Sequence, residues 1–346
     1  MSVLAIVTSS PPSIEGGHLI IARSLVDAAR DAGHDAHLIV TPDYGFGRQG
    51  RAYWRTWHTD VRAIDGRRVE QVISLRYPSY AVRHPRHVCW LNHTMREYYD
   101  LWPRLTASIS APNRVKETVR KVAIRAADRW LLTRNVTRVV AQSHTIRQRL
   151  QQDFDIHADV VHPPPPQRPY RCDAYGDYVF CISRLTAHKR VDLLVRALAD
   201  PVARTVKAVI AGEGEERQTL EAIARTLGVT DRVTFLGRVD DRVMLDHYAR
   251  CRAVCFTPLA EDYGFVTVEA FASAKPVITC TDSGGPTELV KDDETGVVCE
   301  PTPSSIAIAL ARVIDDRRLA ERLGATAATS VSELRWDAAV RQLLLP

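Results

Sequence analysis

The chain has 346 residues, of which 45% are hydrophobic and 25% are charged, and its net charge is +5. These values are ordinary for globular proteins and exclude a disordered tail, a collagen-like repeat and a small disulfide scaffold, while the length predicts two domains at ~100–200 residues each. No apolar run approaches the ~18 residues of a membrane span and no signal peptide opens the chain, so we expect a cytoplasmic protein.

The first 40 residues alternate between strand and helix patterns. The apolar run 3–8 predicts a strand, and residues 36–40 predict a second one. Between them, apolar side chains recur at helical spacing from Leu19 to Ala29, and Gly33 is placed to end that helix. Strand, helix and strand in this order form the βαβ unit of a parallel sheet.

The rest of the first half is less regular. Residues 42–66 are polar and aromatic without periodicity and predict a long surface loop. Further strands are predicted at 86–91 and 137–141. Between these strands, helical spacing predicts a helix with an apolar stripe, formed by Val115, Val119, Val122, Ala126 and Trp130.

Basic residues are concentrated in this half. Residues 1–170 contain 24 Lys and Arg against 15 Asp and Glu, whereas the remainder contains 22 against 26, so the net charges are +9 and −4. Such an imbalance predicts an anionic partner. No helix-turn-helix or aromatic–basic RNA motif accompanies it, so we do not expect nucleic acid. Peripheral attachment to an anionic membrane through residues 114–129 is one interpretation, and a solvated helix face is the other.

A proline-rich segment at 162–169 predicts the domain boundary, because it cannot continue a helix or a central strand. The second half repeats the alternation, with helices predicted at 191–198 and 216–227. Its predicted strands are 178–183, 206–211, 232–236, 253–257 and 276–280. The two halves together predict an α/β protein with two doubly wound sheets that face a cleft and bind ligands beyond the carboxyl ends of their strands.

The segment from Glu261 to Glu269 follows the predicted strand 253–257 and begins a helix. Free backbone N–H groups at residues 264–266 would attract a phosphate, with help from the helix dipole. A carboxylate on each side of this anion cradle would accept hydrogen bonds from pairs of hydroxyls. This order matches the sugar, diphosphate and ribose of a nucleotide sugar. The alternative is a helix whose two acidic residues only cap its dipole or face water.

Other candidate residues also follow predicted strands. Arg184 and Lys189 follow the strand 178–183 and would complement a diphosphate, unless they belong to a solvated basic loop. His93 follows another strand and would bind hydroxyls or relay protons, unless it is structural. No His or Cys spacing matches a metal site, so we expect no metal.

The spacing of Glu261 and Glu269 is the E-x7-E motif of retaining glycosyltransferases of the GT-B fold. The surrounding residues resemble the large family of bacterial mannosyl-, glucosyl- and N-acetylglucosaminyltransferases known as glycosyl transferases group 1. The similar segments of the second half include Ser183-Arg-Leu, Lys189-Arg-Val-Asp192, Ala211-Gly-Glu-Gly214, Phe235-Leu-Gly-Arg-Val239 and Gly284-Gly-Pro-Thr-Glu-Leu289. In the first half the resemblance rests on Gly16-Gly17 and on Trp90-Leu-Asn-His93.

This resemblance implies an organisation and an activity. Residues 1–165 would form the acceptor-side Rossmann-like domain and residues 166–330 the nucleotide-sugar domain, with a C-terminal helix in 331–346 crossing back to the first. The reaction would need neither a metal nor another cofactor, would retain configuration, and would use a nucleotide-diphosphate sugar, most commonly a UDP-sugar. The acceptor would be a hydroxyl of a small molecule, a natural product or a lipid-linked glycan.

The resemblance also implies residue roles. Glu261 would contact the donor sugar near the reacting carbon, Glu269 would hold the ribose, and His93 would complete the catalytic site. The diphosphate would be bound by Arg184, Lys189, Gly17, Gly264, Phe265 and Val266. The nucleobase would lie near Arg238 and Val239.

Two other functions stay open on the same fold. A nucleotide-sugar hydrolase or epimerase would turn over the donor without an acceptor. A two-lobed nucleotide-sugar-binding protein would bind the donor without transferring its sugar.

Overall fold

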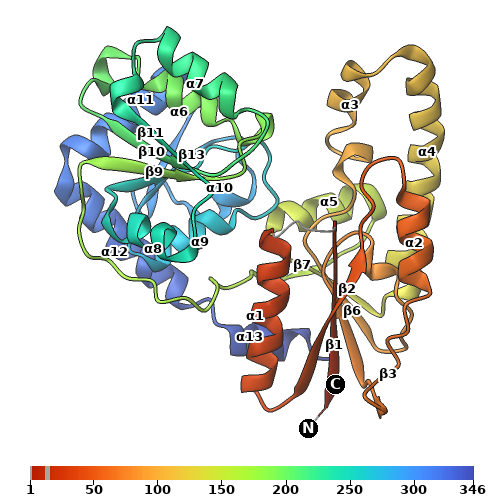
Figure 1. The fold of residues 1–346 in the computed structure, drawn as a ribbon. Coiled ribbons are helices and arrows are strands. Elements are labelled where there is room, and N and C mark those ends of the chain that lie inside the picture. The colour runs from red at the N-terminus through yellow and green to blue at the C-terminus, as the bar shows by residue number, and fades with distance from the viewer. Residues whose placement is uncertain (1, 12–15) are drawn as a thin grey trace. The chain divides into compact units, whose positions relative to one another are not determined.

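The computed structural model describes residues 2–11 and 16–346 (Figure 1). The chain forms two compact units, of which one is Met1–Pro163 with Arg335–Pro346 and the other is Pro164–Leu334. The division between them falls inside the proline-rich segment that predicts a boundary.

The first unit is built on a six-stranded parallel sheet with the order β2-β1-β5-β6-β7-β8. Its strands are β1 (Val3–Ser10), β2 (Asp35–Pro42), β5 (Gln71–Ser74), β6 (His87–Leu91), β7 (Arg138–Ala141) and β8 (Asp159–Val160). The strand order reverses between β1 and β5, and this is the point at which open α/β sheets form a crevice. All eight residues of β1 are buried, as expected for a central strand covered on both faces.

Strands β1, β2, β6 and β7 confirm four predicted strands. Strand β5, which has four residues, was not predicted. Such short segments do not produce a readable periodicity. A small antiparallel hairpin, β3 (Ala63–Ile64) with β4 (Arg67–Arg68), stands outside the main sheet.

The helices of the first unit are α1 (Gly17–Asp31), α2 (Gln49–Trp57), α3 (Trp102–Ser108), α4 (Ala111–Trp130), α5 (His144–Phe154) and α13 (Trp336–Leu343). Gly33 follows α1 in the left-handed conformation, with φ +86°, as a glycine that ends a helix does. The C-terminal helix α13 packs against α1. The Trp336 ring meets the Trp90 ring edge-on at 6.2 Å. The end of the chain therefore belongs to the first unit.

The prediction of one long loop over residues 42–66 is wrong, because the helix α2 lies within it. The buried residues of α2 are Gln49, Ala52 and Thr56. Gln49 donates a hydrogen bond to the Tyr98 hydroxyl at 3.2 Å. Ala52 belongs to an apolar core cluster of the first unit, and Tyr53 and Trp57 pack against it. Gln49 and Thr56 interrupt this apolar face with polar side chains, and a nine-residue helix is too short for the remaining period to stand out.

The predicted helix with an apolar stripe is present as α4, but the stripe faces solvent. Val115, Val119 and Val122 are 68%, 68% and 66% exposed, although an apolar stripe ordinarily marks the side that faces the core. The buried residues of α4 are Glu117, Ile124 and Asp128. Two acidic residues thus occupy the inner face of a predominantly basic helix.

These two carboxylates anchor α4. Asp128 accepts hydrogen bonds from the hydroxyls of Tyr53, Tyr80 and Tyr99, the last at 2.7 Å. Glu117 accepts one from the Tyr98 hydroxyl at 2.8 Å and pairs with Arg120 at 2.6 Å. Hydrogen bonds to a charged acceptor are stronger than neutral ones, so these contacts set the rotation of α4 about its axis.

The Asp128 carboxyl gives a pH-dependent prediction. Burial raises its pKa from 3.8 to about 6, although Tyr53, Tyr80, Tyr99 and Arg125 oppose this rise. A raised folded-state pKa makes a contribution to stability that is complete below about pH 4 and is lost as pH rises through about 6. At about 1.4 kcal/mol per pH unit, the unfolding free energy of wild type relative to Asp128→Asn should fall by about 2 kcal/mol between pH 4 and 7. Urea denaturation measures this difference, and a pH-independent difference would contradict the prediction.

The second unit also contains a six-stranded parallel sheet, with the order β11-β10-β9-β12-β13-β14. Its strands are β9 (Tyr178–Ile182), β10 (Lys207–Ala211), β11 (Val233–Gly237), β12 (Ala253–Cys255), β13 (Val277–Cys280) and β14 (Gly296–Cys299). All five predicted strands are confirmed, and β14 was missed. The strand order reverses between β9 and β12, which makes their carboxyl ends the switch point of this sheet.

Helices cover both faces of this sheet. They are α6 (Val191–Ala197), α7 (Arg217–Thr226), α8 (Asp241–Arg250), α9 (Phe265–Ala272), α10 (Gly285–Leu289), α11 (Pro303–Asp315) and α12 (Arg317–Ser332). In β9, Val179 and Cys181 enter one apolar cluster and Phe180 enters another. Alternate side chains of a strand point to opposite faces, so each face of the sheet has its own core.

Among the described residues, no helix has both the length and the apolar character needed to cross a lipid bilayer. The seven cysteines, all within the described part of the chain, are free, and five of them are buried.

Candidate active site

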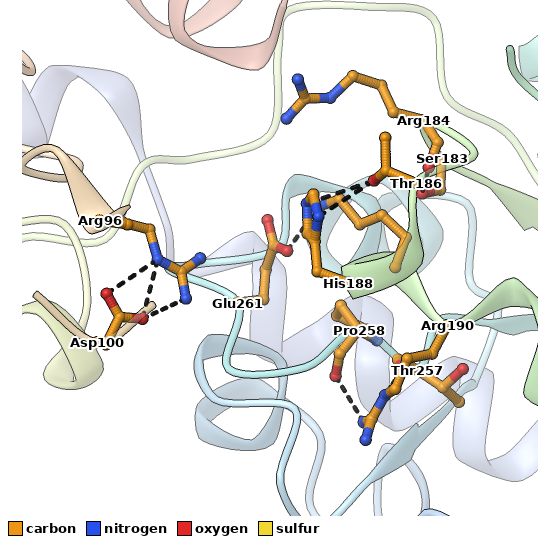
Figure 2. Close-up of polar contacts among 11 residues, drawn as sticks. Arg96, Asp100, Ser183, Arg184, Thr186, His188, Arg190, Thr257, Pro258 and Glu261 are labelled. Atoms are coloured by element: carbon orange, nitrogen blue, oxygen red, sulfur yellow. Dashed lines mark hydrogen bonds and ion pairs between the residues drawn. The ribbon is translucent and has the colours of Figure 1, made fainter. Parts of the chain in front are cut away.

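Two connections carry most of the predicted site residues in the second unit. Strand β9 leads through Arg184 to a short 3-10 helix, Ala187–Lys189, and β12 leads through Glu261 to the start of α9. Both connections leave the carboxyl ends of the two strands at the switch point, so the parallel topology itself brings them together. Figure 2 shows the side chain of Arg184 extending away from the strand end, and Arg184 is exposed.

Lys189 and Glu261 form an ion pair, with the Lys189 Nζ 2.5 Å from the Glu261 Oε2. The backbone of Glu261 is also held, because its N–H donates to the Ser283 carbonyl at 2.8 Å and its carbonyl accepts from the Gly285 N–H at 2.8 Å. Lys189, which is predicted to bind the diphosphate, therefore neutralises Glu261, which is predicted to be catalytic. This contact fixes the orientation of the Glu261 side chain.

The loop that carries Glu261 requires glycine at position 284. Gly284 has φ +75°, and a Cβ there would lie 2.6 Å from the Glu261 carbonyl oxygen. Such a distance is shorter than van der Waals contact, and the positive φ also disfavours other residues. The sequence Gly284-Gly285 is thus explained by close packing of two backbones.

The predicted anion cradle lies at the start of α9. Gly264 occupies the N-cap with φ +84°, and no side chain caps the helix. The uncapped N–H groups at a helix start carry a partial positive charge. Lys189 lies near this point, since its Nζ is 5.6 Å from the centre of the Phe256 ring and a Cβ on Gly264 would be 3.0 Å from that ring. Lys189, Glu261 and Gly264 therefore gather around Phe256.

Glu269 lies one turn into α9 and is buried. Its Oε1 accepts hydrogen bonds from Arg168 at 2.7 Å and from the Tyr170 hydroxyl at 3.2 Å, and its Oε2 accepts one from the Tyr248 hydroxyl at 3.0 Å. Burial raises the pKa of Glu269, while Arg168, Tyr248 and Tyr170 act in the opposite direction. Three donors thus fix this carboxylate and leave part of Oε2 for a further donor.

The sequence does not predict these donors or the role of one more residue, Arg190. Arg168 lies in the proline-rich segment, and Tyr248 lies on α8, so no local pattern links either to Glu269. Arg190 pairs with Asp282 at 2.6 Å. It also donates a hydrogen bond to the Pro258 carbonyl at 2.8 Å (Figure 2). Arg190 therefore holds the connection that follows β12 and leads to Glu261.

The remaining predicted residues are distributed over both units. Val239 follows β11 and packs in the apolar cluster that includes Phe265 and Val266, while Arg238 is exposed. His93 lies two residues beyond β6 in the first unit, with its Nδ1 2.7 Å from the Thr94 carbonyl oxygen.

Gly17 is the first residue of α1 and is exposed. Of the eleven predicted residues, nine therefore lie in the second unit and two in the first.

The geometry agrees with a comparison to protein families. Residues 173–330 match the family model described as Glycosyl transferases group 1. This stretch of the second unit is therefore similar to group 1 glycosyltransferases. All nine predicted residues of the second unit lie within the matched range.

The similarity to curated relatives covers about half of this chain. The chain is 35% identical over 176 residues to a GDP-mannose-dependent alpha-(1-6)-phosphatidylinositol monomannoside mannosyltransferase of Mycobacterium tuberculosis, with 48% of this chain and 46% of that protein covered. It is 33% identical over 162 residues to an uncharacterized glycosyltransferase of Methanocaldococcus jannaschii, with 46% and 41% covered. The chain thus spans less than half the length of these relatives.

Solved structures resemble the whole chain. A complex of Anabaena Alr3699/HepE with UDP and glucose has a TM-score of 0.71 at 18% identity, over 98% of this chain and 97% of that one. At this level of identity the similarity establishes the fold alone. The chain has the GT-B fold with two Rossmann-like units, which confirms the predicted fold class.

Proposed function

We propose that the protein is a retaining glycosyltransferase that moves a sugar from a nucleotide-diphosphate sugar to a hydroxyl without a metal. The observation that carries this proposal is the grouping of Lys189, Glu261 and the uncapped start of α9 at one switch point. The group 1 match over residues 173–330 supports the assignment. Cation, carboxylate and helix dipole there complement a sugar diphosphate.

The donor would replace an existing contact. Lys189 is bound to Glu261 at 2.5 Å, and a diphosphate at the start of α9 would offer Lys189 a more highly charged partner. Glu261 would then be free to accept hydrogen bonds from the donor sugar. Arg184, which is exposed, would add a second cation, and the backbone at Gly264, Phe265 and Val266 would add donors.

The proposed reaction is a same-face substitution. The bond from the anomeric carbon to the diphosphate oxygen breaks, and a bond to the acceptor oxygen forms on the same face of the sugar. The acceptor proton passes to the leaving phosphate oxygen. Lys189, Arg184 and the helix dipole would stabilise the negative charge that develops on that phosphate, which is the role a metal has in other enzymes.

The other parts of the donor have proposed partners too. The Oε2 of Glu269 accepts one hydrogen bond, from Tyr248, and would accept another from a ribose hydroxyl. The base is proposed to lie near Arg238 and Val239. The family resemblance extends the proposal to His93 and Gly17 of the first unit as further donor ligands.

A donor screen tests this proposal. The family resemblance implies a UDP-sugar as the commonest donor, whereas the M. tuberculosis relative is named for GDP-mannose, so UDP- and GDP-sugars are the first pair to compare. At a concentration of 100 Kd the correct donor should add about 2.7 kcal/mol to the unfolding free energy. Thermal unfolding with each donor measures this effect, and no stabilisation by any of the UDP-, GDP-, ADP- or dTDP-sugars would contradict the proposal.

Turnover assays distinguish the competing functions. A transferase consumes the donor only with an acceptor, and its product keeps the anomeric configuration of the donor sugar. A hydrolase or epimerase consumes it without an acceptor, and a binding protein does not consume it.

We expect turnover to be unchanged by EDTA, because protein cations bind the diphosphate. Loss of turnover with EDTA and its recovery with Mg²⁺ would contradict metal independence.

The proposed acceptor is a hydroxyl of a small molecule, a natural product or a lipid-linked glycan. The basic charge of residues 1–170 agrees with work at an anionic membrane surface on the cytoplasmic side, where a lipid-linked acceptor is found.

A further inference from the structure

The exposed face of α4 has a continuous apolar stripe. Val115, Val119 and Val122 are each about two-thirds exposed and Trp130 is half exposed. Of the eleven large hydrophobic residues exposed in the described part of the chain, these four lie on one helix. Single exposed apolar residues are normal, but a contiguous exposed stripe indicates an interaction surface.

The charges around this stripe are all basic. Helix α4 contains six Lys and Arg and two acidic residues, and both acidic residues are buried. Arg114, Lys116 and Arg129 are exposed. At 100° per residue, Arg114 and Arg129 lie on one side of the valine stripe and Lys116 lies on the other. The stripe is therefore bordered by positive charge on both sides.

The structure does not allow this stripe to turn inward. The opposite face of α4 is held by the hydrogen bonds of Asp128 to three tyrosines and of Glu117 to Tyr98. Figure 1 shows α3 and α4 as a helical hairpin that projects beyond the strands of the first sheet. An outward apolar face with a basic border on a projecting hairpin has the pattern of a helix that lies in a membrane interface.

We propose that α4 docks on an anionic membrane surface, with Val115, Val119 and Val122 inserted among the acyl chains and Arg114 and Lys116 at the lipid phosphates. Arg129 would take the same position at the other end of the helix. A second copy of this chain fits less well, because a symmetric interface through α4 would place basic residues against basic residues. This inference rests on the membrane contact in the proposed function and names the surface that would make it. Its test does not depend on sugar transfer.

Vesicle sedimentation tests the proposal. We expect the full chain to bind vesicles of phosphatidylcholine with phosphatidylglycerol, and to bind pure phosphatidylcholine at least about tenfold more weakly. The triple change Val115→Ser, Val119→Ser and Val122→Ser keeps the charge and should weaken binding about tenfold or more. The triple change Arg114→Gln, Lys116→Gln and Arg129→Gln should weaken it similarly and reduce its salt dependence.

A matched control is available in the second unit. Ile308 on α11 is 57% exposed, and Ile308→Ser should bind vesicles as wild type does. Circular dichroism should show all variants folded, since the changed side chains are exposed.

Three results would overturn the proposal. Vesicle binding that the valine changes leave intact would reject the α4 face while keeping peripheral contact elsewhere. Absence of vesicle binding would reject both the α4 docking surface and peripheral membrane contact. A dimer that only the valine changes dissociate would assign the face to a second copy. Sugar transfer to a water-soluble acceptor should be the same in all variants, so failure here is distinct from failure of the proposed activity.

Discussion

Lys189→Ala should lower kcat/KM for sugar transfer about 10²–10³-fold, the cost of removing one group that stabilises charge in a transition state. The reason is the position of the Lys189 Nζ, which lies 2.5 Å from Glu261 and over the Phe256 ring, which Gly264 at the uncapped start of α9 also approaches. The affinity for the nucleoside diphosphate should also fall, whereas the affinity for the nucleoside alone should not. Steady-state kinetics and product inhibition measure both effects.

Lys207 provides the matched control for this change. It belongs to the same unit and pairs with Asp177 at 2.7 Å, but both side chains are more than half exposed. Exposed ion pairs contribute little, so Lys207→Ala should behave as wild type. An equal effect of Lys189→Ala on nucleoside and nucleoside diphosphate would show that Lys189 acts only by holding the loop of Glu261.

Glu269→Ala should lower the unfolding free energy by about 3–5 kcal/mol and should abolish tight donor binding. The change removes one member of a buried ion pair with Arg168 and leaves two tyrosine hydroxyls, Tyr170 and Tyr248, without their acceptor. Breaking a largely buried pair by removing one partner is destabilising, because Arg168 then keeps only the exposed Asp241 as its ion-pair partner. Urea denaturation measures the loss of stability.

A conservative variant separates the two effects. Glu269→Gln keeps the shape and one acceptor oxygen, so we expect a smaller loss of stability but a donor affinity reduced by about tenfold. Glu213→Ala is the control, since this carboxylate is 57% exposed where it pairs with Arg217, and it should cost less than about 1 kcal/mol. Wild-type donor affinity in Glu269→Gln would contradict the ribose role of Glu269.

Local patterns determined much of the fold in advance. The apolar runs of β1, β9 and β10 are readable because buried parallel strands are hydrophobic along their whole length. The same reasoning failed for α2, whose inner face carries Gln49 and Thr56, and for short strands such as β5. An element that is short, or whose inner face mixes polar and apolar residues, has a period too weak to detect.

The candidate site divides in the same way. Glu261, Gly264 and Glu269 could be predicted because one strand-to-helix connection contains them all. Arg168 and Tyr248 could not, because Arg168 reaches Glu269 across 101 residues and Tyr248 reaches it from a different helix. Contacts of this kind depend on the order of strands in the sheet, which the local sequence does not encode.

The amino-acid sequence by itself determined the alternation of strands and helices, the spacing of the two glutamates and the basic character of the first half. Only the tertiary structure decided that Lys189 pairs with Glu261, that three side chains hold Glu269, and that the valines of α4 face outward. Periodicity shows that a helix has two different faces, but not which of them is buried. For α4 the choice depends on Asp128 and the tyrosines around it, which are far apart along the chain and meet only in the folded unit.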